Sequence, residues 1–213
     1  MTDAFWPWLS WAADLPALPV PLLHRAGLHL GWALVLAALV SHLVAACPPG
    51  WRRAAVLGVA VLALVPGPSG PTYWLGLAFQ LPSLSAMGLA LWWLMGPRRS
   101  AVPHATQRAW ALGIAALGWV LLLDTLALLP WPLYRLGYGQ PAVAVLLLLT
   151  GWLASTPASR RSAWVLGVVT LVFVLTRLPS GNLWDALCDP WLWLAAQLWL
   201  ARSGWRRATP LGQ

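Results

Sequence analysis

The chain alternates long apolar stretches with short segments rich in Pro, Gly and Arg. A helix needs about 20 mostly apolar residues to cross the hydrocarbon core of a bilayer, and the intervening Pro and Gly residues favour turns. This alternation predicts an all-α fold, a polytopic transmembrane helical bundle of about seven spans. The predicted spans are Ala26–Ala46, Arg52–Pro66, Thr72–Met95, Ala109–Leu129, Gln140–Ala154, Ser162–Leu178 and Leu183–Ala201.

The composition favours the same class of protein. Of the 213 residues, 60% are hydrophobic and only 8% are charged, whereas soluble domains carry about 25% charged residues. All 13 basic residues are Arg, and they occur singly or in pairs between apolar runs. A nucleic-acid-binding surface requires a clustered basic patch or stripe. The net charge of +8 therefore does not indicate nucleic acid as a partner.

The positions of the arginines predict an orientation. Cytoplasmic loops of membrane proteins carry an excess of Arg and Lys. With seven spans and an outer N-terminus, ten arginines fall on one side, and Arg25, Arg135 and Arg177 fall on the other. We therefore expect a multi-pass protein of a bacterial inner membrane, with its N-terminus out and its C-terminus in. The second span is the weakest, because only Ala54–Val65 is uninterrupted, but omitting it would destroy the arginine bias.

Three regions follow from this topology. Residues 1–25 contain several tryptophans and two aspartates, which indicates an interfacial segment lying along the outer surface. Residues 26–201 form the transmembrane bundle, and residues 202–213 form a basic cytoplasmic tail. All five acidic residues fall on the outer side, although the positive-inside rule hardly constrains aspartate.

Asp124 interrupts an otherwise apolar stretch of the fourth predicted span, LGWVLLLDTLALL. An ionisable side chain within the bilayer costs at least about 2.5–3.5 kcal/mol and normally faces a partner inside the bundle. The candidate partners are Arg135, Arg177, His29 and a protonated Asp189. A functional role and a purely structural interhelical hydrogen bond both remain open.

The stretch RLPSGNLWDALCDPWLW holds Asp185 and Asp189. Asn182 is a good helix N-cap, and Asp185 would follow in the first turn, near the positive end of the helix dipole. Pro190 disfavours a straight helix, because its ring clashes with the carbonyl four residues earlier. We expect Asp185 to serve as a cap and Asp189 to be the acid available for chemistry. The alternative is that both acids stay hydrated where a helix begins among the head groups.

Polar side chains gather in the outer half of the predicted bundle, whereas the inner half holds few. This distribution predicts a polar pocket open to the outer side rather than a pore through the membrane. The candidate ligand-binding residues are Gln80, Asp124, Tyr134, Arg135, Tyr138, Arg177, Asp185 and Asp189.

The sequence carries no set of residues typical of a known cofactor or catalytic centre. A retinal Schiff base needs Lys, and the chain has none. Zinc-ligand spacings, nucleotide-binding loops and the serine nucleophile elbow are also missing. We therefore predict no cofactor and no metal centre, and we assign no catalytic residue.

Together these features favour an integral membrane binding or accessory protein. Its outward pocket would engage a lipid head group, a small solute, a lipid-linked molecule or a partner membrane protein. One alternative is a membrane-embedded enzyme acting on a lipid-linked substrate at the outer leaflet, with Asp124 and Asp189 as acid and base. Another is a proton- or ion-coupled transporter of a small solute that uses Asp124.

Overall fold

The computed structural model describes residues 18–95, 103–157 and 159–208, without the side chains of residues 205–208. Every regular element in these ranges is a helix. The predicted all-α class is thereby confirmed, and most of the proposed outer-surface segment lies outside the described residues. The helices are α1 (Pro21–Leu43), α2 (Pro49–Ala63), α3 (Pro71–Phe79), α4 (Leu84–Leu94), α5 (His104–Thr125), α6 (Leu133–Leu136), α7 (Gln140–Ala154), α8 (Arg160–Thr176), α9 (Leu183–Leu187) and α10 (Pro190–Ala208).

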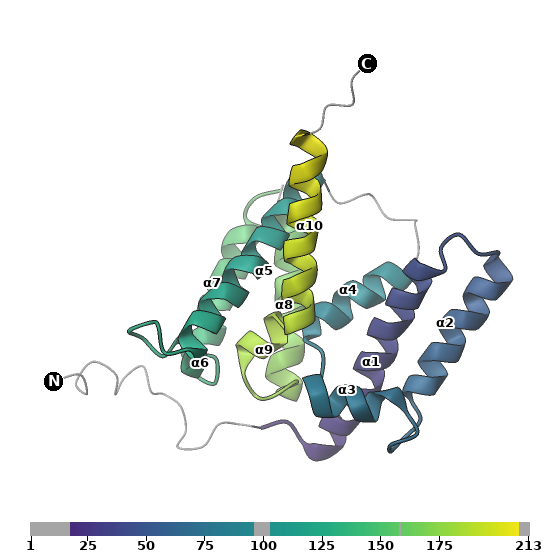
Figure 1. Cartoon of the computed structure of the whole chain (residues 1–213). Helices are drawn as coiled ribbons and strands as arrows, with labels where there is room; N and C mark the ends of the chain where they lie inside the picture. The colour runs from purple at the N-terminus through teal and green to yellow at the C-terminus, as the bar shows by residue number, and fades with distance from the viewer. Residues whose placement is uncertain (1–17, 96–102, 158, 209–213) are drawn as a thin grey trace.

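The long helices pack as neighbouring pairs. Figure 1 shows α2 beside α1 and α10 beside α5, and α7 likewise packs on α8. Helix α4 packs on α1 and also contacts α8 and α9, so it connects the α1–α2 pair to the helices that follow α4 in the chain. At the α1–α4 contact, Gly31 faces the end of the Met87 side chain, and such small residues let helices approach closely.

Five of the predicted spans correspond to single helices. Helix α7 has the predicted bounds, Gln140–Ala154, and α8 begins and ends two residues before the predicted span. Helices α1, α2 and α5 each overlap their predicted spans but begin several residues earlier. Helix α10 continues to Ala208, so residue 202, where the predicted tail begins, lies within a helix.

The third predicted span, Thr72–Met95, consists of two helices, α3 and α4. The chain leaves α3 at Gln80, which has a φ of 58°, and α4 begins only at Leu84. Pro82 lies in this break, and the Ser83 hydroxyl accepts a hydrogen bond from the Ala86 N–H at 3.0 Å. A capping serine after a proline starts a new helix rather than continuing the old one.

The seventh predicted span, Leu183–Ala201, is also two helices. Helix α9 ends at Leu187, and Cys188 has extended backbone angles. Helix α10 then begins at Pro190, a position at which proline is favoured because the N–H of that residue would have no partner within the helix. The expected disruption at Pro190 is thus confirmed, and it breaks the helix rather than bending it.

A seven-span bundle is consequently not supported. Within the part of the chain that the structure describes, two helices, Pro21–Leu43 and His104–Thr125, are long and apolar enough to cross a membrane. Helices α2 and α7 have 15 residues each, which is about 22 Å at a rise of 1.5 Å per residue. That length is below the roughly 30 Å of a hydrocarbon core. Helix α8, with 17 residues, is also below this length. The shortness of these three helices and the breaks above account for the difference from prediction.

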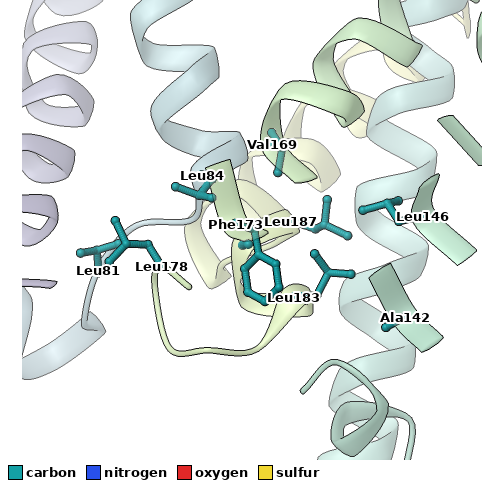
Figure 2. Close-up of a cluster of buried hydrophobic side chains, with 10 residues drawn as sticks. Leu81, Leu84, Ala142, Leu146, Val169, Phe173, Leu178, Leu183 and Leu187 are labelled. Carbon is teal, nitrogen blue, oxygen red and sulfur yellow. The ribbon is translucent and has the colours of Figure 1, made fainter. Parts of the chain in front are cut away.

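The buried core is small and lies where α4, α7, α8 and α9 meet. Figure 2 shows Phe173 at its centre, with Leu183 and Leu187 of α9 close by. Phe173, Leu183 and Ala186 are fully buried. Because α9 supplies three core side chains in five residues, this short helix holds the neighbouring polar segment in a fixed position.

Candidate functional site

Three of the predicted polar residues, Asp124, Tyr134 and Asp185, meet in one hydrogen-bonded cluster. The cluster lies where α5 ends, α6 forms a single turn, and α8 connects to α9 (Figure 1). We call this region, residues 124–139 and 180–189, the capped end of the molecule.

Asp124 lies near the end of α5 and is half-buried. Its Oδ1 accepts a hydrogen bond from the Leu133 N–H at 3.1 Å, and its Oδ2 accepts one from the Tyr134 N–H at 2.7 Å. These are the first two N–H groups of α6, which have no partner within the helix. Asp124 thus caps a helix nine residues further along the chain. The expected partners, Arg135, Arg177, His29 and Asp189, were wrong.

The α6 segment docks on the start of α9 through three hydrogen bonds to backbone carbonyls. The Asn182 Nδ2 donates to the Tyr134 carbonyl at 2.9 Å, and the Trp184 Nε1 donates to the Leu133 carbonyl at 2.8 Å. The Leu183 N–H donates to the Gly137 carbonyl at 2.9 Å. Asn182 is fully buried, and its Oδ1 accepts from the Trp184 N–H at 2.9 Å, which confirms the predicted cap of α9.

Gly137 is required by this docking. A Cβ atom at this position would overlap the Asn182 side chain and the Trp184 ring. The absence of a side chain therefore lets the α6 segment lie against the start of α9.

Asp185 accepts hydrogen bonds from side-chain hydroxyls rather than from backbone N–H groups. The Tyr134 hydroxyl donates to its Oδ2 at 2.8 Å, and the Ser180 hydroxyl donates to the same oxygen. Burial and the negative charge of Asp185 raise the pKa of Tyr134 well above its usual value, so this phenol stays protonated at physiological pH. Tyr134 consequently joins two acids, since its N–H binds Asp124 and its hydroxyl binds Asp185.

Asp189 lies between the beginnings of two helices. Its Oδ1 accepts from the Leu192 N–H of α10 at 2.7 Å, and its Oδ2 accepts from the N–H of Ser83, the N-cap of α4, at 2.8 Å. Helix N-termini stabilise a carboxylate through free N–H groups and the helix dipole. Asp189, rather than Asp185, therefore has the capping role, and it ties α4 to α10.

The other predicted residues make different contacts. Gln80 is exposed, and its backbone carbonyl accepts a hydrogen bond from the Trp32 Nε1 at 2.8 Å. Tyr138 contacts Tyr134 edge to face, with 6.0 Å between the ring centroids, and Arg135 is exposed on α6. Arg177 ends α8 in a left-handed conformation with its guanidinium over the Phe173 ring.

The depression beside the cluster is lined by residues that the sequence did not single out. It has a volume of about 380 Å³ and is formed by Leu18, Pro19, Pro21, His24, Arg25, Pro179 and Ser180. The His24 Nδ1 lies 3.1 Å from the Pro179 carbonyl oxygen, which fixes the ring at the rim. Adjacent His24 and Arg25 at the start of the first apolar stretch were the available sequence signal. Ser180 links this depression to Asp185.

No protein-family model matches the chain, and no curated protein and no solved structure is significantly similar to it. The geometry of the site is therefore the basis for the function proposed below.

Proposed function

We propose that the chain is a multi-pass membrane protein of a bacterial inner membrane, with its N-terminus outside and its C-terminus inside. Large apolar side chains are exposed along several helices, including Leu148 and Trp152 of α7 and Leu171 and Leu175 of α8. A soluble monomer rarely exposes contiguous apolar surface on this scale. Lipid contact on these faces would remove them from water.

The distribution of arginines supports the proposed orientation. In the described residues, six arginines lie where α2, α5 and α8 begin or near the end of α10, away from the capped end. We call this region the arginine end, and its residues are Arg52, Arg53, Arg108, Arg160, Arg161 and Arg202. Basic residues favour the cytoplasmic side of a membrane, so the capped end would face outward.

Within this membrane protein, we infer a binding or accessory role at the outward depression. The observation that carries this inference is the way Asp124 and Asp189 are used. Both oxygens of each carboxylate accept backbone N–H groups, which is the arrangement of helix caps rather than of an acid–base pair or a proton carrier. The enzyme alternative depends on both acids and the transporter alternative on Asp124, so the geometry favours binding.

The lining of the depression indicates the chemistry of the ligand. Arg25 is exposed and His24 is half-buried, so both can meet an anionic group. The Ser180 oxygen, whose hydrogen points to Asp185, can accept a hydrogen bond from a ligand hydroxyl. Proline and leucine side chains supply the apolar part of the lining. A lipid head group or small solute carrying both an anion and a hydroxyl fits this combination.

Native mass spectrometry of the protein purified in mild detergent tests this function without assuming a ligand. We expect the protein to retain a bound molecule that is lost in a His24→Ala, Arg25→Gln double variant. Arg135→Gln removes an exposed arginine outside the depression and is the matched control. Absence of any bound molecule from the wild type, or equal retention in the double variant, would contradict the proposed binding role.

A further inference from the structure

A second depression lies between α5 and α10, far along both helices from Asp124 and Asp189. It has a volume of about 220 Å³ and is lined by Arg108, Leu112, Leu200, Ser203 and Gly204. Helices α5 and α10 pack along their length, so both walls of the depression are fixed. None of the residues in the capped end contributes to it.

The lining changes from apolar to polar along the helix axes. Arg108 and Leu112 are four residues apart on one face of α5, and Arg108 lies nearer the helix start. Leu200, Ser203 and Gly204 follow the corresponding spacing on α10, with Ser203 and Gly204 nearer its end. Helix α5 begins and α10 ends at the arginine end. Arg108 and Ser203 therefore lie nearer that end of the molecule, and Leu112 and Leu200 lie farther from it. A phospholipid has the same arrangement, with a polar head group followed by apolar chains.

The polar part of the depression is basic and open. Arg108 is exposed, and among the residues that the structure describes it has no hydrogen-bonding or ion-pair partner. Arg202 lies close in sequence to Ser203 and is exposed as well. Apart from the adjoining part of α10, no atom of the described residues lies within 4 Å of the position that a Cβ of Gly204 would take. A guanidinium that is not engaged within the protein can bind a phosphate in a bidentate manner.

The apolar part continues onto the surface of the helices. Leu112 is 49% exposed, so an acyl chain that follows it remains in contact with the lipid-facing side of α5. A soluble anion would use only Arg108 and Ser203 and leave this apolar surface in water. The charge and the apolar lining together favour one occupant, an anionic phospholipid.

We propose that the depression between α5 and α10 binds an anionic phospholipid of the inner leaflet, with its phosphate at Arg108 and an acyl chain along Leu112 and Leu200. The Ser203 hydroxyl, which donates to the Leu200 carbonyl at 2.9 Å, would turn from that carbonyl to the phosphate. Basic pockets between helices on the cytoplasmic side of a membrane recognise such head groups. This proposal depends on the membrane location proposed above but not on the outward depression.

Thermal unfolding of the full chain in detergent, with lipid added, tests the proposal. We expect phosphatidylglycerol to raise the Tm in a saturable manner and phosphatidylcholine to leave it unchanged. Arg108→Gln should weaken the apparent affinity for phosphatidylglycerol about tenfold, since it removes a charge-assisted bond to phosphate. Gly204→Leu, which fills open space in the depression, should weaken it to a similar extent without impairing folding.

Control measurements separate the possible outcomes. Arg135→Gln, on α6 at the capped end, should respond to phosphatidylglycerol as the wild type does. Equal stabilisation by both lipids, or an unchanged response in Arg108→Gln and Gly204→Leu, would overturn the proposal. Inorganic phosphate that stabilised the protein as strongly as the lipid would also overturn it, because a soluble anion would then suffice. Carbonate extraction of cell membranes tests the membrane location separately. A chain that stays in the membrane but whose Tm does not change with phosphatidylglycerol would refute the lipid site alone.

Discussion

The capped end and the arginine end use their charged residues in different ways. At the capped end, Asp124, Asp185 and Asp189 accept hydrogen bonds from backbone or side-chain groups distant in sequence. At the arginine end, Arg108 and Arg202 project outward and are exposed. The acids thus hold the structure together, whereas the exposed Arg108 side chain lines a depression. An acidic residue in an apolar sequence is consequently a weaker indicator of chemistry here than a basic residue beside a depression.

Substitution of Gly137 should destabilise the capped end most. In Gly137→Ala, the added Cβ would overlap buried Asn182 and separate α6 from α9. Overpacking costs about 1–3 kcal/mol, and loss of the hydrogen bonds to Tyr134 and Leu133 would add to it. We expect a large fall in the Tm measured by circular dichroism in detergent.

The matched control for this substitution is Gly58→Ala in α2. Outside the adjoining part of α2, no atom of the described residues lies within 4 Å of the new Cβ. Alanine is favoured over glycine within a helix by about 0.5–1 kcal/mol, so this variant should be neutral or slightly stabilised. Equal Tm values for the two variants would show that α6 does not pack on α9 as described.

Asp189→Ala should have the next largest effect. It leaves the Ser83 N–H and the Leu192 N–H without their acceptor. Loss of a helix cap costs about 0.5–2 kcal/mol, and an unsatisfied buried donor costs about 1–3 kcal/mol, so we expect a total of about 2–4 kcal/mol. Asp189→Asn retains one carbonyl acceptor and should lose about half as much in the same unfolding measurement. If both variants unfolded like the wild type, α4 and α10 would not depend on this carboxylate.

Asp124→Ala should cost less, about 1–2 kcal/mol, because it uncaps only the short helix α6. Thr125→Ala is a suitable neighbour for comparison, since this exposed hydroxyl donates to the Leu122 carbonyl in its own helix. Its Tm should stay close to that of the wild type. A functional role for Asp124 beyond capping would instead appear as lost ligand binding in a variant of normal stability.

Tyr134→Phe should have the smallest effect at neutral pH, about 0.5–1.5 kcal/mol for one hydrogen bond. Its pH dependence is more informative. The folded protein raises the pKa of Tyr134 above that of the unfolded chain, which is about 10. At pH values above about 10 the unfolded state loses its proton first, so stability falls as pH rises. The phenylalanine variant should show a shallower fall of Tm between pH 9 and 11, and an identical slope would contradict the Asp185–Tyr134 contact.

The sequence predicted local features better than long-range ones. The bounds of α7, the Asn182 cap and the disruption at Pro190 each depend on residues close in sequence, and all three are confirmed. The partner of Asp124 could not be predicted because it is the backbone of residues 133 and 134, and backbone N–H groups leave no trace in residue type. Hydropathy alone likewise did not distinguish one long helix from two short ones, although Pro82 and Ser83 mark the break.

The eight candidate residues were predicted as one pocket, but the structure separates them. Asp124, Tyr134 and Asp185 do meet, because α6 docks on the start of α9. Asp189 instead turns towards Ser83, since it caps the helix that Pro190 starts. His24 and Ser180 were missed as a pair, because they share a surface only where the start of α1 meets the segment that follows α8.

Thiol labelling in intact cells tests most directly whether the capped end and the arginine end lie on opposite sides of a membrane. Cys47 is exposed between α1 and α2, next to the arginine end, and buried Cys188 is a poor target for the reagent. The wild-type protein reports on Cys47, and a variant that combines Cys47→Ala with Arg135→Cys reports on α6. With an impermeant maleimide, we expect Arg135→Cys to react in cells whose outer membrane is permeable, and Cys47 to react only after the inner membrane is opened. Reaction of both cysteines from the same side would contradict the account.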